Sequence, residues 1–127
     1  MLHQIVSPHM AAHPGGCPSW CVKDHAGEAS GSPGDRDRGH SRTVMETHKG
    51  EDRGIAVDIF SLEHLDQPEE STSAEVFVSA QGPLSLADAG YLATSIRKAV
   101  LLARHTHRPY WLKPGVSVLV RRDPSGR

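Results

Sequence analysis

One stretch of helical periodicity near the C-terminal end limits the choice of fold more than any other part of this sequence. Ser85 and Asp88 have the form of a helix-capping box with Asp in place of the usual Glu, so we expect a helix from this point to about His105. Its small and apolar residues recur at helical spacing: Ala89, Leu92, Ala93, Ile96, Ala99, Val100 and Ala103. Such a stripe must be buried against another element, so the chain has to supply a second layer.

Two stretches before the helix alternate as strands do, and they predict that second layer. Residues 55–62 and 74–80 place apolar side chains at every second position, and residues 41–47 form a weaker strand. Ile55, Val57, Ile59 and Ser61 share one face of the first stretch, which we expect to be partly buried on both sides, and Ala74, Val76, Val78 and Ala80 share one face of the second. Short loops favour antiparallel pairing. We therefore expect an α+β fold, with a three-stranded antiparallel sheet and one C-terminal helix packed on it.

The rest of the chain offers little material for a core. Only 37% of the residues are apolar and 5% are aromatic, and the chain contains 12 Gly and 9 Pro. We predict a disordered arm over residues 1–16, a Cys/His segment with a flexible loop over 17–40, and a ββ(β)α domain over 41–105. Residues 106–127 should form a basic tail, in which 116–120 is an optional edge strand.

The charges divide sharply between the two parts of the chain. Residues 1–84 contain thirteen acidic and six basic residues, whereas residues 85–127 contain eight basic and two acidic ones. The simpler interpretation is that the two parts of the chain attract each other. The more specific one is that the basic part contacts an acidic partner or nucleic acid. The candidate residues for contact with such a partner are Arg97, Arg104, Arg108, Lys113, Arg121 and Arg122.

The sequence shows no export or membrane signal. The first residues lack a basic and then apolar leader, and the longest apolar run, 99–103, is far shorter than a spanning helix requires. We therefore expect a cytoplasmic protein without membrane contact. In that compartment two neighbouring cysteines are more often metal ligands or redox thiols than a permanent disulfide.

The only ligand-like constellation is a Cys/His cluster made of Cys17, Cys21, His25 and His40. Zn²⁺ commonly takes two thiolates and two imidazoles in a tetrahedron. If residues 20–25 wind into a helical turn, Cys21 and His25 project to the same side. His40 then closes the site where the first strand starts, and Trp20 covers one side of it. The cluster therefore predicts a structural Zn²⁺ that fixes an otherwise apolar-poor leader.

Alternatives stay open at this point. The cysteines can be idle thiols or a reversible redox pair, although redox pairs usually have the Cys-x-x-Cys spacing. His13 or His48 can replace His40 as the fourth ligand. A Cys21 nucleophile activated by His25 is a further alternative, but no oxyanion-hole or pocket pattern accompanies it.

The stretch Cys17-Pro-Ser-Trp-Cys21, followed by His25, His40 and the Leu86-Ala-Asp-Ala helix, resembles a family of small uncharacterised actinobacterial proteins. These proteins carry a Cys-Pro-x-Trp-Cys…His…His head before a short sheet and a closing helix, and the resemblance covers about residues 17–103. It implies the same ligand set and a similar fold. It implies no activity, because the role of that family is itself unassigned, and the basic extension after His105 departs from the pattern.

These observations predict a non-catalytic, zinc-stabilised interaction module with a protein partner, engaged through the sheet face opposite the helix. The alternative is a nucleic-acid-binding accessory protein that uses the basic C-terminal segment, with Tyr110 and Trp111 as stacking rings. A thiol redox or hydrolytic enzyme ranks third.

Overall fold

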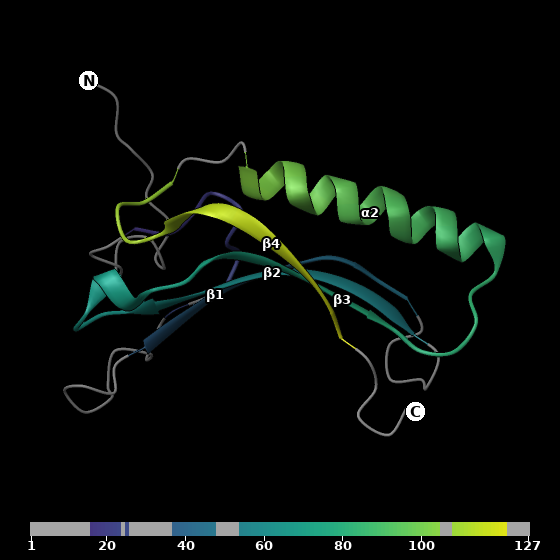
Figure 1. Cartoon of the computed structure of the whole chain (residues 1–127), viewed down its shortest axis with the longest axis horizontal. Helices are drawn as coiled ribbons and strands as arrows, with labels where there is room; N and C mark the ends of the chain where they lie inside the picture. Colours follow the sequence, from purple (N-terminus) through teal and green to yellow (C-terminus); the bar gives the residue numbers. More distant parts are fainter. Residues whose placement is uncertain (1–15, 24, 26–36, 48–53, 105–107, 122–127) are drawn as a thin grey trace.

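A computed structural model of the chain describes residues 16–23, 25, 37–47, 54–104 and 108–121. Within these residues the order of elements is β1 (Asp37–Glu46), β2 (Ile55–His64), η2 (Pro68–Glu70), β3 (Ser73–Ala80), α2 (Leu86–Arg104) and β4 (Lys113–Arg121). Figure 1 shows α2 lying along one face of a twisted sheet. The predicted α+β class with one helix on a sheet is confirmed for this part of the chain.

The sheet has four strands in the order β1-β2-β3-β4, so the predicted three-stranded antiparallel sheet is too small. The first three strands pair antiparallel as expected, but β4 pairs parallel to β3. A parallel pair requires a long crossover, and α2 supplies it between Ala80 and Lys113. The strand treated as optional over residues 116–120 is therefore a full element of the sheet.

The alternation predicted for β2 and β3 is confirmed, and the structure shows which face of each strand is the buried one. Ile55, Val57, Ile59 and Ser61 are all buried, and Ala74, Val76 and Val78 are buried beside them. The helix begins as predicted, because the Asp88 backbone N–H donates a 3.0 Å hydrogen bond to Ser85 Oγ. The first backbone N–H groups of a helix have no acceptor within the helix, and this bond supplies one for Asp88.

The packed face of α2 differs from the predicted stripe. Ala89 and Ala93 are exposed, whereas Ala99 is fully buried and Ser95 nearly so. The residues of the helix that pack against the core include Leu92, Ile96, Val100, Leu102 and Ala103. The first turns of the helix therefore reach beyond the core, and the stripe lies closer to the C-terminal end than the periodicity alone indicated.

The segment that carries the cysteines packs against the same core. Cys17, Trp20 and Cys21 belong to one buried apolar cluster that also contains Met45, Val57 and other inward residues of the sheet. The Val22 backbone N–H donates a 3.1 Å hydrogen bond to the Ser41 carbonyl, so this segment runs against the edge of β1. The Cys/His segment thus covers one end of the sheet face on which α2 lies.

Candidate metal centre

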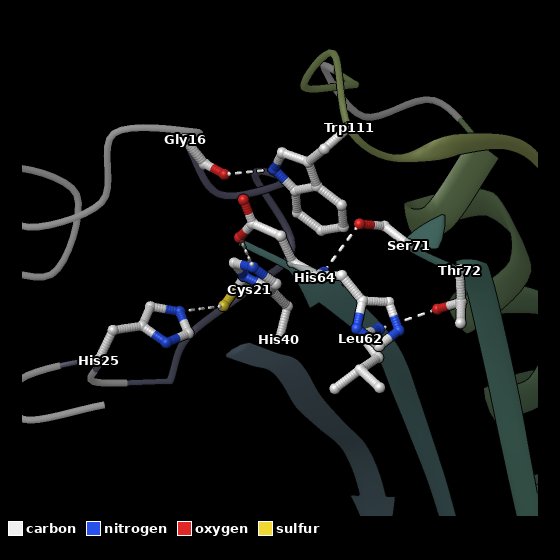
Figure 2. Close-up of polar contacts among 10 residues, drawn as sticks. Gly16, Cys21, His25, His40, Leu62, His64, Ser71, Thr72 and Trp111 are labelled. Carbon is white, nitrogen blue, oxygen red and sulfur yellow. Dashed lines mark hydrogen bonds and ion pairs between the residues drawn. The ribbon is translucent and has the colours of Figure 1, made fainter. Parts of the chain in front are cut away.

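Four side chains converge at this end of the sheet. The ligand atoms of Cys17, Cys21, His25 and His40 all lie within 4.8 Å of one another, and all four residues are buried. Cys21 Sγ lies 3.5 Å from His25 Nε2, a contact that Figure 2 marks with a dashed line. The rings of His25 and His40 meet edge to face with their centroids 4.7 Å apart. Residues separated by 23 positions in the sequence therefore form one compact cluster.

The local backbone reaches this arrangement by a different route from the predicted one. The chain turns at Ser19 and Trp20, and the Cys21 backbone N–H donates a 2.9 Å hydrogen bond to the Pro18 carbonyl. Residues 21–23 then continue without helical structure. The helical turn predicted over residues 20–25 is wrong for these described residues, because the backbone of Val22 pairs with β1 instead.

His40 is the fourth residue of β1, so the strand begins earlier than residue 41, where the sequence placed its start. It faces Ser61 of β2 in the strand register, and its side chain is fully buried. A strand position fixes the backbone on both sides of His40, so the sheet holds this imidazole, while the other three residues of the cluster come from the segment before β1. His13 and His48, the alternatives for the fourth ligand, lie outside the described residues.

Glu63 of β2 supports the His40 ring from behind the cluster. His40 Nε2 donates a 3.0 Å hydrogen bond to Glu63 Oε1, and only 2% of the Glu63 surface is exposed. The bond leaves the buried Nδ1 as the nitrogen that can bind a metal. Carboxylates in this position orient metal-binding histidines and raise their basicity. Arg38, 2% exposed, faces Glu63 directly across the two strands, so opposite charges are buried together.

Trp111, from the turn before β4, covers His40. The two rings are stacked with centroids 4.6 Å apart, and Trp111 Nε1 donates a 2.9 Å hydrogen bond to the Gly16 carbonyl beside Cys17. Figure 2 shows this indole directed at Gly16 above the cluster. Trp20, which was predicted to cover the site, is buried in the same apolar cluster as Cys17 and Cys21. Because Trp111 is only 2% exposed, it cannot serve as the predicted stacking ring for nucleic acid.

The sequence reasoning missed Glu63 and Trp111. A signal for Glu63 was available, since it continues the inward alternation of Ile59 and Ser61 along β2. A carboxylate at an inward position of a strand requires a buried partner, and a histidine or arginine on the neighbouring strand is the simplest one. No comparable local pattern indicated that Trp111 would return to residue 16.

The cluster also controls the protonation of its own thiols. A hydrogen bond from the Cys17 thiol lowers the pKa of Cys21 to about 3. The same hydrogen bond, together with burial, raises the pKa of Cys17 well above its usual range. Burial opposes the charged form of His40, but hydrogen bonds with Cys21 and Glu63 outweigh it and raise the His40 pKa. Of the two cysteines, Cys21 is therefore the one whose thiolate these contacts favour, and the thiolate is the form of cysteine that binds metals.

The basic residues that were predicted to contact an acidic partner lie, where they are described, on α2, beside Trp111 and on β4. Arg97 and Arg104 are exposed on α2, and Arg108 and Lys113 are exposed on either side of Trp111. Arg121 ends β4, and Arg122 lies outside the described residues. No helix in the described part of the chain is both long and apolar enough to cross a membrane.

The arrangement defines a class of site, a buried Cys₂His₂ cluster that is a candidate for holding a metal ion. Comparisons of the chain with family models, with curated proteins and with solved structures found no match. The resemblance to small actinobacterial proteins stays a prediction.

Proposed function

We propose that Cys17, Cys21, His25 and His40 hold a structural Zn²⁺ and that the protein is a non-catalytic, zinc-stabilised interaction module. The observation that carries the proposal is the convergence of two thiol and two imidazole groups within 4.8 Å in a buried site. Zn²⁺ bonds of about 2.3 Å to sulfur and 2.0–2.1 Å to nitrogen place tetrahedral ligand atoms roughly 3.3–3.8 Å apart. The 3.5 Å separation of Cys21 Sγ and His25 Nε2 already has this value.

The same geometry favours a structural role over a catalytic one. Four protein ligands fill a tetrahedral zinc site, whereas catalytic sites keep one position for water or substrate. The hydrogen bond from His40 to Glu63 supports the same assignment, because that carboxylate is engaged behind the ligand and does not point at an open position. A redox pair is less well supported, since a disulfide would make no use of the two histidines that converge on the cysteines.

Metal analysis of the purified protein tests the proposal. We expect one zinc per chain in the wild type, and its loss in Cys17→Ser and in His40→Ala. His64→Ala is the matched control, because His64 is a β2 histidine that pairs with Asp37 outside the cluster. Substitution with Co²⁺ gives a second readout in the unaltered chain, namely the intense visible bands of a tetrahedral S₂N₂ site. Folded protein that contains no metal and takes up no Co²⁺ would exclude the site.

The partner in this proposal is a protein that binds the sheet face opposite α2. Phe60 of β2 and Phe77 of β3 meet on that face with ring centroids 6.1 Å apart. They line a shallow hollow of about 390 Å³ together with Thr43, Asp58 and other polar residues. Aromatic side chains surrounded by polar ones are typical of the centre of a protein interface.

Nucleic acid binding by the basic C-terminal segment is the second candidate. Tyr110 favours it, because this ring is 77% exposed between Arg108 and Lys113. An exposed ring flanked by cations can stack on an unpaired base. A gel-shift series in rising salt tests it: binding should weaken with salt, and Tyr110→Ala should weaken it further. Binding that does not respond to salt would exclude this role.

A further inference from the structure

Away from the metal centre, three cationic side chains gather around one hollow between the end of α2 and the start of β4. The hollow measures about 530 Å³, and Arg104, Arg108 and Lys113 stand among its lining residues. Its apolar part includes Val100 and Val116, with Ala74 and Ala103 beside them. Three of the six basic residues singled out in the sequence are thus drawn into one concave site, while Arg97 stays outside it.

An irregularity in the sheet accompanies this hollow. Ser73 pairs with Lys113 but the next residue, Ala74, pairs with Val116, so two residues of β4 bulge out of the ladder. The second of them, Gly115, has a φ of +98°, a conformation that side chains with a Cβ rarely adopt. Both bulged residues line the hollow. Bulges of this kind are over-represented beside functional sites, where they redirect a strand.

Among the residues that the structure describes, none with an acidic side chain lines the hollow. Arg108 Nη1 donates a 3.0 Å hydrogen bond to the Leu112 carbonyl, which ties its guanidinium to the turn that carries Trp111. The guanidinium has five N–H donors, so this bond occupies only one of them. The C-terminal end of α2 contributes about half a negative charge nearby, which three full positive charges outweigh.

We propose that this hollow binds a small organic anion, a molecule in which a carboxylate or phosphate group is joined to an apolar body. The three cations recognise the anionic group and the valine and alanine side chains receive the apolar part. The volume lies within the range of about 300–1,000 Å³ that is usual for small-molecule sites. A single concavity suits a small ligand better than a nucleic acid strand, which needs cations spread along a track.

Titration calorimetry with four probes tests the proposal: phenyl phosphate, benzoate, inorganic phosphate and benzyl alcohol. Phenyl phosphate should bind once per chain, at least tenfold more tightly than inorganic phosphate and than benzyl alcohol, because only it satisfies both parts of the hollow. Benzoate should compete with it. The double substitution Arg104→Gln and Lys113→Gln should weaken phenyl phosphate at least tenfold. Arg97→Gln, which removes an exposed cation of α2 outside the hollow, should change it less than twofold.

Two further readouts keep the outcome decisive. Amide chemical shifts of the wild type should move on adding phenyl phosphate at Val100, Lys113 and Val116, a result that needs no variant. Each variant should retain the metal content of the wild type, so that failure of this site is distinguishable from failure of the metal centre. Three results would overturn the proposal. Phenyl phosphate and inorganic phosphate could bind equally tightly, Arg97→Gln could weaken phenyl phosphate as much as the double substitution does, or no probe could bind saturably. Tighter binding of an eight-nucleotide oligothymidylate that depends on Arg97 would replace it with the nucleic acid role.

Discussion

The two ends of one sheet face are buried in different ways. At the end covered by α2, the inward residues of β2 and β3 are apolar, as Ile55, Val57 and Val78 show. At the end covered by the Cys/His segment, β2 buries Ser61 and Glu63, and β1 buries His40 beside them. A chain with only 37% apolar residues therefore completes its core with polar groups. Apolar side chains can pack against any apolar neighbour, whereas each buried polar group needs its own hydrogen-bond or charge partner.

This contrast predicts that metal removal has the largest effect, and that the effect is local. A structural zinc contributes on the order of 10 kcal/mol of apparent binding free energy, which the metal-free chain forfeits. After treatment with a chelator, hydrogen exchange should accelerate most at Cys21, Val22 and His40. The amides of Val57 and Val76 should stay protected for much longer, because apolar packing holds them.

Two results of the chelator experiment would contradict a local effect of metal removal. Uniform loss of protection along the sheet would mean that the apolar end is not stable by itself. Unchanged protection at Val22, whose N–H is bonded to Ser41, would mean that the leader is held without a metal. Adding Zn²⁺ back should restore the original exchange pattern, which serves as the control.

The apolar end should respond to a different change. Ile55 is 2% exposed and lies at the end of β2 away from Ser61, so Ile55→Ala removes buried methyl and methylene groups and leaves a cavity. We expect the free energy of unfolding to fall by about 2–5 kcal/mol. The metal content should stay at that of the wild type. Denaturant unfolding with parallel metal analysis measures both quantities, and a simultaneous loss of metal would show that the two ends are one cooperative unit.

Glu63 should have an intermediate effect that is confined to the metal end. Glu63→Gln keeps an oxygen for the His40 N–H but removes the negative charge, so the imidazole becomes a weaker ligand. Losses of this kind typically reduce metal affinity 10–100-fold. Competition with a chromophoric chelator measures the affinity. Glu69→Gln is the matched control, because Glu69 is an exposed carboxylate of η2. An equal change in both variants would contradict a specific role for Glu63.

Local patterns predicted what depends on neighbours in the sequence. The alternation of Ile55, Val57 and Ile59 predicted that they share one face of β2, and Ser85 marked the start of α2. The four-residue spacing of the cysteines pointed to a cluster that the structure indeed assembles, although through a turn and an edge contact and not through a helix.

What failed depends on contacts between distant parts of the chain. No local pattern near Val116 predicts that β4 pairs parallel to β3, because that pairing follows from the path of α2 across the sheet. The contact of Trp111 with the Cys/His cluster was missed for a similar reason. Its indole closes a contact over 95 residues to Gly16, and β4 positions the turn from which it comes. A composition argument instead placed this ring on a nucleic acid surface.

Ser61 provides the test with the smallest expected effect on the contrast between the apolar and polar ends of the sheet face. It occupies an inward position between Ile59 and Glu63, it is fully buried, and its hydroxyl has no hydrogen-bond partner among the described residues. An unmatched buried hydroxyl costs roughly 1–3 kcal/mol, so Ser61→Ala should leave the free energy of unfolding unchanged or raise it by up to about 1 kcal/mol. Thermal unfolding of the metal-loaded protein measures the change, with Ser79→Ala on the opposite face as the control. A clear loss of stability in Ser61→Ala alone would mean that this hydroxyl is matched when the metal is bound, and that the polar end of the sheet is complete only in that state.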